Sequence, residues 1–411
     1  MIEFVIFSLL GIAIGIITGL IPGLHVNTIL PIILSSLLFL DPYYLAVFVV
    51  SIAVTQLFIS YIPSIFLGAP EEDTSLSVLP GHRLLLEGRG YEAIKLIVVG
   101  SMGSLFLTLV LIYFLSTYFQ ILYEASRPFI AYLIGGVVLF MILLEKEVRK
   151  ILSAALIILL SGLLGILTLS SSLVPATKVL FPVLTGLFGL STLIVSMSQK
   201  SKIPDQKVED EMKISMAEVF KSIFLGSIAG IAVGFLPAIG VSQAATLVQY
   251  AGGMGETRSF LVTLSGINIA NEIFSLISLF LVGNPRSGAS VAIEKILTEL
   301  SANDVLLLIG TICFVSGIAI IVTLFLGRKI PQMLVKLNYK YLSLSVIIFI
   351  VSMVAVVTGL LGLLVLVTST SIGILCNSLG ARRSNCMGVL LLPSILFFLG
   401  LNPLIISILG I

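Results

Sequence analysis

Long apolar stretches alternate with short polar segments along this chain. The apolar stretches recur near residues 96–117, 129–145, 151–170, 178–197, 305–326 and 344–364. A helix of about 20 apolar residues crosses the hydrocarbon core of a bilayer. The pattern therefore predicts an all-α, polytopic membrane protein.

Composition supports this class of protein. Of the 411 residues, 58% are hydrophobic and 10% are charged. A water-soluble domain carries about a quarter charged residues, so this chain has too few of them to cover a soluble surface. The net charge of +2 offers no basic surface for nucleic acid. Cys313, Cys376 and Cys386 lie in or beside apolar segments and are interpreted as small hydrophobic residues.

The chain repeats itself at an interval of 215 residues. Glycines and prolines coincide after this shift: Gly11 with Gly226, Gly15 with Gly230, Gly19 with Gly234, Pro22 with Pro237, Gly68 with Gly283, Pro70 with Pro285 and Ser75 with Ser290. Matching glycine ladders that end in proline, followed by matching Gly-x-Pro breaks, indicate a common origin of the two halves.

A long polar stretch separates these halves. Residues 199–213 read QKSKIPDQKVEDEMK and cannot lie in hydrocarbon. We therefore predict a first transmembrane repeat over 1–198, a cytoplasmic linker over 199–217 and a second transmembrane repeat over 218–411.

The distribution of Lys and Arg predicts the orientation of the spans. Most of these residues fall into five clusters: Arg83, Arg89 and Lys95; Lys146, Arg149 and Lys150; Lys200, Lys202, Lys207, Lys213 and Lys221; Arg328, Lys329, Lys336 and Lys340; Arg382 and Arg383. The first three clusters are separated by pairs of spans, so all three can be cytoplasmic. If 328–340 is also inside, one span places 294–304 outside, whereas its repeat partner 79–89 is inside. The halves are thus predicted to have inverted topology, as in many secondary transporters.

Each glycine ladder predicts a closely packed helix face that ends in a break. The breaks are Leu20–His25 (LIPGLH) and Phe235–Gly240 (FLPAIG). Proline removes a backbone donor, and an interrupted helix at membrane depth must bury its free groups in protein or line a wet cavity. The helix that restarts after the break presents N–H groups and a positive dipole end, which favour an anion. A simple proline kink, or a turn between two spans, is the alternative.

A second pair of breaks is richer in hydroxyl groups. These breaks are Ser60–Ser75 (SYIPSIFLGAPEEDTS) and Val282–Ser290 (VGNPRSGAS). Both place small and hydroxyl residues after Gly-x-Pro, where a new helix would begin. Arg286 is isolated in an apolar region and can clamp a carboxylate with two hydrogen bonds. A side chain that extends to the membrane surface is the alternative for this arginine.

Acidic and amide residues near these breaks are candidates for ion coupling. Glu71, Glu72 and Asp73 form either a cation or proton site, or a solvated helix N-terminus. Asn268, Asn271 and Glu272 form a polar patch in an apolar segment. Polar residues at the presumed symmetry axis suit a midplane site, with helix–helix hydrogen bonding as the alternative.

The candidate site collects these residues. For substrate binding they are Pro22, Gly23, His25, Asn27, Gly68, Pro70, Thr74, Ser75, Pro237, Gly240, Asn268, Pro285, Arg286, Ser287 and Gly288. For ion coupling they are Gln56, Glu71, Glu72, Asp73, Asn271 and Glu272, where Gln56 is the repeat partner of Asn271.

Motifs of enzymes and metal sites were not found. The two histidines, His25 and His82, are too far apart in sequence for a catalytic or metal constellation, and His82 is expected to be solvated in a basic loop. Neither a nucleotide-binding loop nor a Ser/His/Asp arrangement is recognisable. We therefore expect no enzyme activity, no metal and no cofactor, apart from Na⁺ as a candidate coupling ion.

At these residues the sequence resembles the TctA family, the large membrane subunit of the tripartite tricarboxylate transporters. Gly15–Gly23 (GIITGLIPG), 68–90, Phe181–Leu193 (FPVLTGLFGLSTL) and 234–240 correspond to family segments, and the resemblance covers about residues 8–295. Departures include His25 and Ala238 in place of glycines, and 69–72 (APEE) in place of PGEP, whereas the Glu at 272 is kept. The resemblance implies a cation-coupled importer of organic anions that works with an extracytoplasmic binding protein and a small membrane subunit.

The first hypothesis is therefore a secondary transporter of a small carboxylate in the cell (cytoplasmic) membrane, coupled to Na⁺ or H⁺. A polyprenyl-phosphate translocase is the alternative, because the same helix dipoles suit a phosphate. A membrane scaffold or receptor is a third possibility, although it gives no reason for the broken helices. A transporter needs a cavity closed to lipid, whereas a translocase of lipid-linked phosphate needs a lateral opening.

Overall fold

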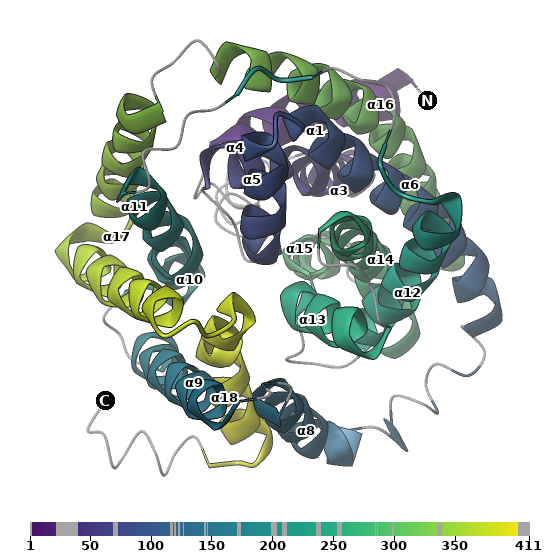
Figure 1. Cartoon of the computed structure of the whole chain (residues 1–411). Helices are drawn as coiled ribbons and strands as arrows, with labels where there is room; N and C mark the ends of the chain where they lie inside the picture. Colours follow the sequence, from purple (N-terminus) through teal and green to yellow (C-terminus); the bar gives the residue numbers. More distant parts are fainter. Residues whose placement is uncertain are drawn as a thin grey trace.

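The computed structural model consists of helices (Figure 1). It describes residues 2–21, 40–68, 73–115, 118, 121, 124–125, 127–143, 145, 147–170, 174–198, 204–207, 212–235, 240–252, 257–283, 285, 287–297, 300–334 and 339–401. Nine helices in these ranges are long and apolar enough to cross a membrane. The predicted all-α, polytopic membrane fold is therefore confirmed.

The elements of the first half precede the polar linker. They are α1 (Ile2–Leu20), α3 (Pro42–Ile59), α4 (Tyr61–Leu67), η1 (Ser75–Ser77), α5 (Val78–Leu86), α6 (Gly90–Leu115), η2 (Arg127–Phe129), α8 (Ile130–Leu143), α9 (Val148–Leu169), α10 (Ala176–Leu184), η3 (Thr185–Leu190) and α11 (Ser191–Ser198). The η3 segment is a π-helix.

The elements of the second half follow the linker. They are α12 (Met216–Phe235), α13 (Val241–Ala251), α14 (Arg258–Val282), α15 (Gly288–Ile296), α16 (Ala302–Leu334), α17 (Tyr339–Ser378), η4 (Arg383–Met387) and α18 (Gly388–Phe398). Helix α17 is kinked at Gly359, which has a φ of 70°.

The glycine ladders are the faces along which two equivalent helix pairs pack. In the first half, Gly15 of α1 lies against Thr55 and Ile52 of α3. In the second half, Gly230 of α12 lies against Ala270 and Ile267 of α14. These partners are again 215 residues apart, as are the partners of the other ladder glycines. The two halves thus build the same close helix packing, as the repeat predicts.

The contacts of α15 indicate the relative direction of α3 and α14. Helix α15, which follows the end of α14, packs on α3, and its Ala289 and Ala292 share one apolar cluster with residues 45–53 of α3. Helix α14 therefore ends on the side of the molecule where α3 begins. The opposite directions agree with an inverted relation between these helices, and inversion of the complete halves stays a prediction.

Helices of the two halves interleave in two bundles (Figure 1). The first bundle contains α1, α3 to α6 and α12 to α16. The second bundle contains α8 to α11, α17 and α18, which lie together on the left and lower side of the view. Each bundle therefore takes helices from both halves of the sequence, so that neither half forms a separate body. The boundaries of the two predicted repeats stay a prediction.

Helix interruptions occur where the glycine and proline pattern predicts them. Helix α4 ends at Leu67 and α14 ends at Val282. Each is capped by a glycine in the left-handed conformation, Gly68 with a φ of 64° and Gly283 with a φ of 63°. A left-handed cap is accessible to glycine and strained for other residues, which explains why glycine precedes both breaks.

The interpretation of His82 as a solvated residue of a basic loop is wrong. It lies in helix α5, where only 5% of its surface is exposed. Its Nδ1 atom is 3.3 Å from the carbonyl oxygen of Ile65, because Gly81 allows α5 to pack closely on α4. Burial lowers the pKa of His82, which favours the neutral imidazole within α5.

A single methyl group on the ladder is expected to destabilise the fold. In Gly230→Ala the new Cβ atom would lie 2.5 Å from the Cβ atom of Ala270, and overpacking of this kind costs about 1–3 kcal/mol. Gly135→Ala in α8 is the matched control, because nothing lies within 4 Å of its added Cβ atom. The thermal unfolding midpoint in detergent, measured at a fixed scan rate, should fall for Gly230→Ala. An equal midpoint for both variants would contradict close packing at this position.

Candidate functional site

The second-half break is held by a network of serine side chains. Ser287 caps α15: its side chain accepts a hydrogen bond from the Ser290 N–H, and its own N–H donates to Ser290 Oγ at 2.9 Å. The Ser287 N–H also donates to Ser275 Oγ of α14 at 2.6 Å. The Ser287 hydroxyl donates to Glu272 Oε1 at 3.1 Å. The structure thus brings the predicted residues Ser287 and Glu272 together.

The first-half break has a corresponding hydroxyl cluster. Ser64 Oγ of α4 lies 2.9 Å from Ser77 Oγ and donates to the carbonyl oxygen of Thr74 at 3.1 Å. Ser75 Oγ lies 3.0 Å from Ser242 Oγ near the start of α13. This contact joins the first-half break to the helix that follows the Phe235–Gly240 break. The predicted residues Thr74 and Ser75 are both buried there.

The centre of the first bundle carries polar side chains from both halves. Asn268 of α14 donates a hydrogen bond from Nδ2 to the Tyr61 hydroxyl of α4 at 3.4 Å. The Oδ1 atom of Asn268 is buried and has no hydrogen-bond partner in the described part of the chain. The Asp73 carboxyl group interacts electrostatically with both Tyr61 and Glu272. The structure therefore brings the predicted coupling residues Asp73 and Glu272 into one electrostatic environment.

The other predicted residues fall into two groups. Gln56 is buried in α3, while Asn271, Gly240, Pro285 and Gly288 are partly buried. The remaining predicted residues lie outside the described ranges: Pro22, Gly23, His25, Asn27, Pro70, Glu71, Glu72, Pro237 and Arg286.

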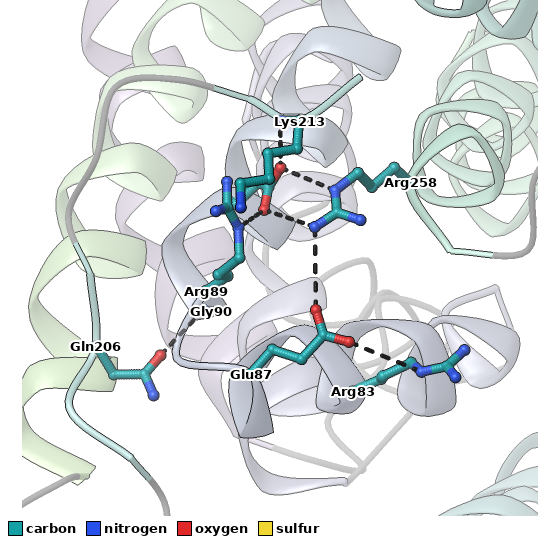
Figure 2. Close-up of polar contacts among 8 residues, drawn as sticks. Arg83, Glu87, Arg89, Gly90, Gln206, Lys213 and Arg258 are labelled. Carbon is teal, nitrogen blue, oxygen red and sulfur yellow. Dashed lines mark hydrogen bonds and ion pairs between the residues drawn. The ribbon is translucent and has the colours of Figure 1, made fainter. Parts of the chain in front are cut away.

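A buried carboxylate at the beginning of α6 was missed by sequence reasoning. Glu92, 4% exposed, pairs with Arg89 and accepts hydrogen bonds from Arg258 Nε at 3.0 Å and from the Lys213 N–H at 2.7 Å (Figure 2). Arg258 begins α14, and Lys213 belongs to the end of the linker. Glu92 therefore joins α6, α14 and the linker on one side of the first bundle.

The linker also forms hydrogen bonds close to this carboxylate. The Gly90 N–H donates to Gln206 Oε1 at 3.0 Å (Figure 2). Gln206 Nε2 donates to the Leu85 carbonyl oxygen at 2.9 Å. The Lys207 N–H donates to the Gly88 carbonyl oxygen at 2.8 Å. The described part of the linker is thus packed on the α5–α6 turn. The local sequence carries no signal for this contact beyond the polarity of the linker.

Comparison with known proteins identifies the family. The model of the tripartite tricarboxylate transporter TctA family matches residues 5–388. The chain belongs to the TctA family. The match extends well beyond the region of about 8–295 in which the resemblance was recognised from motifs, and it therefore includes α16, α17 and η4.

One relative can be aligned over nearly its whole length. The chain is 34% identical over 412 aligned residues to the uncharacterised protein MJ1079 of Methanocaldococcus jannaschii, covering 96% of this chain and 98% of the relative. No solved structure matches. Family membership makes the chain a multi-pass membrane component of a tripartite transporter, a type of assembly that has other subunits.

Proposed function

We propose that this chain is the large membrane subunit of a secondary transporter that moves a small carboxylate across the cell membrane, coupled to Na⁺ or H⁺. The observation that carries the proposal is the pair of equivalent breaks, each capped by a left-handed glycine and followed by buried or partly buried serines. Hydroxyl groups and restarting helices are suited to an anion at membrane depth.

Coupling is supported by the position of Glu272. This carboxyl group lies in the membrane-spanning helix α14 and bonds to Ser287, which begins the short helix α15. An ionisable residue within a span generally marks an ion or substrate pathway. Protonation or cation binding at Glu272 would change the hydrogen bond that holds the break, and so would link the ion to the substrate site.

Partner subunits follow from the family. Within a tripartite transporter this chain would receive its substrate from an extracytoplasmic binding protein and would work beside a small membrane subunit. We propose both partners on the basis of family membership alone.

Uptake into proteoliposomes tests the proposal. The purified protein, with and without candidate partner subunits, is reconstituted and supplied with radiolabelled succinate or citrate under a Na⁺ gradient, a pH gradient or neither. We expect accumulation above that of empty liposomes under one of the two gradients. Equal labelling of protein-containing and empty liposomes under every condition would contradict the proposed function.

A further inference from the structure

Four short elements from the two bundles form a closed ring of contacts. Ser75 of η1 bonds to Ser242 of α13, and α13 in turn packs against η4 of the second bundle. Arg383 of η4 donates to the Leu187 carbonyl oxygen of η3, and η3 packs against η1. In Figure 1 the yellow η4 turn lies beside α13. The ring thus lies where the hydroxyl-rich breaks of the first bundle meet the second bundle.

Arg383 is the charged residue of this ring. The sequences of η1 (SLS), α13 (VSQAATLVQYA), η3 (TGLFGL) and η4 (RSNCM) contain no other Asp, Glu, Lys or Arg. Its guanidinium group is partly buried, and within the described residues it forms no ion pair. A partly buried cation without a carboxylate partner is costly, and an anionic ligand would offset that cost.

The hydrogen bonds of Arg383 use only one nitrogen of its guanidinium group. Both hydrogen bonds of Arg383 use Nη1, one to the Leu187 carbonyl oxygen at 2.9 Å and one to Ser191 Oγ at 2.6 Å. These bonds fix the side chain while Nε–H and Nη2–H have no partner in the described part of the chain. That edge of a guanidinium is the one that binds a carboxylate with two parallel hydrogen bonds.

Two further groups of the ring can donate hydrogen bonds without carrying a charge. Thr185 of η3 is fully buried, and its Oγ1 atom has no hydrogen-bond partner among the described residues. Helix α13 begins at Val241, so that its free N–H groups and positive dipole end belong to the same ring. A π-helix such as η3 often marks a functional site, because its wider turn displaces side chains and backbone groups.

We propose that Arg383 binds a carboxylate group of the transported anion between the two bundles, assisted by Thr185 and the beginning of α13. The inference rests on the proposed function and names Arg383 as a charged residue that contacts the substrate. Because Arg383 belongs to the second bundle and Ser75 and Ser242 to the first, a bound anion would hold the two bundles together.

The test compares kinetics of Arg383 variants in proteoliposomes. Uptake of radiolabelled succinate and citrate is measured for the unaltered protein, Arg383→Gln, Arg383→Lys and the control Arg149→Gln, whose side chain is exposed on α9. We expect KM to rise about 10- to 150-fold in Arg383→Gln, which corresponds to charged hydrogen bonds of about 1.5–3 kcal/mol. Arg383→Lys should show a smaller rise, because lysine keeps the charge but loses the two-pronged geometry.

Competition by succinamate, in which an amide replaces one carboxylate, separates binding from structure. The unaltered protein and Arg149→Gln should prefer succinate to succinamate as competitor, and Arg383→Gln should lose this preference. A purely structural role would reduce the amount of active protein without changing the preference.

If Arg383→Gln does not fold, an unchanged KM and preference in Arg383→Lys would overturn the inference. If the unaltered protein transports substrate and Arg383→Gln has the same KM and the same preference, the role of Arg383 is overturned and the proposed function stays intact. If the unaltered protein shows no uptake, both are overturned.

Discussion

Glu92→Ala is expected to lower the stability of the folded protein by about 3–5 kcal/mol. The variant removes a carboxylate that is 4% exposed, and with it the ion pair of Arg89, which is also largely buried. It also leaves the Lys213 N–H without the acceptor that lies 2.7 Å away. Because the side chain of Arg258 is 25% exposed, water would solvate part of its charge, and the lower end of this range is expected.

Titration with a denaturing detergent, followed by circular dichroism, measures this loss. Glu147→Ala is the matched control, because Glu147 pairs with Lys150 at 2.9 Å and their side chains are 66% and 43% exposed. Such surface pairs contribute about 0–1 kcal/mol. Glu92→Gln should be nearly as unstable as Glu92→Ala, since its neutral amide cannot balance the arginines. A Glu92→Gln variant as stable as the Glu147→Ala variant would show that the carboxylate charge does not hold α6, α14 and the linker together.

Glu272→Gln is expected to weaken ion-driven accumulation of substrate strongly while leaving the protein folded. Glutamine keeps an acceptor oxygen for the Ser287 hydroxyl, now 3.1 Å from Glu272 Oε1, but it loses the negative charge. If Glu272 carries the coupling ion, stimulation of uptake by the ion gradient should fall by roughly 5- to 150-fold, the usual range for a coupling free energy of about 1–3 kcal/mol.

Two further variants separate the charge from the hydrogen bond. Ser287→Ala removes the hydroxyl donor and keeps the carboxylate, so it should weaken binding at the break but retain stimulation by the gradient. Glu147→Gln removes an exposed carboxylate that precedes α9 and should behave like the unaltered protein. Full gradient stimulation in Glu272→Gln would show that the coupling ion binds elsewhere.

Local patterns explain why much of the fold could be predicted. The spans were recognisable because a helix in lipid needs a long apolar run, and the end of α4 at Leu67 because glycine and proline act on the backbone next to them. Ser287 and Glu272 were predicted separately as site residues, and the structure shows that they meet where α14 is followed by α15. Arg383 was interpreted as an orientation signal, since the sequence does not reveal that it reaches Ser191 in the other half.

By itself, the sequence determined the membrane class, the duplicated glycine ladders and the positions of the breaks, because hydrophobic length and backbone restriction act over neighbouring residues. The tertiary structure alone decided how the halves interleave in two bundles, why His82 is buried and which partners surround Glu92 and Arg383. These features depend on side chains that are far apart in the chain and meet when helices pack. Their pairing is set by the global arrangement, for which a local pattern carries no signal.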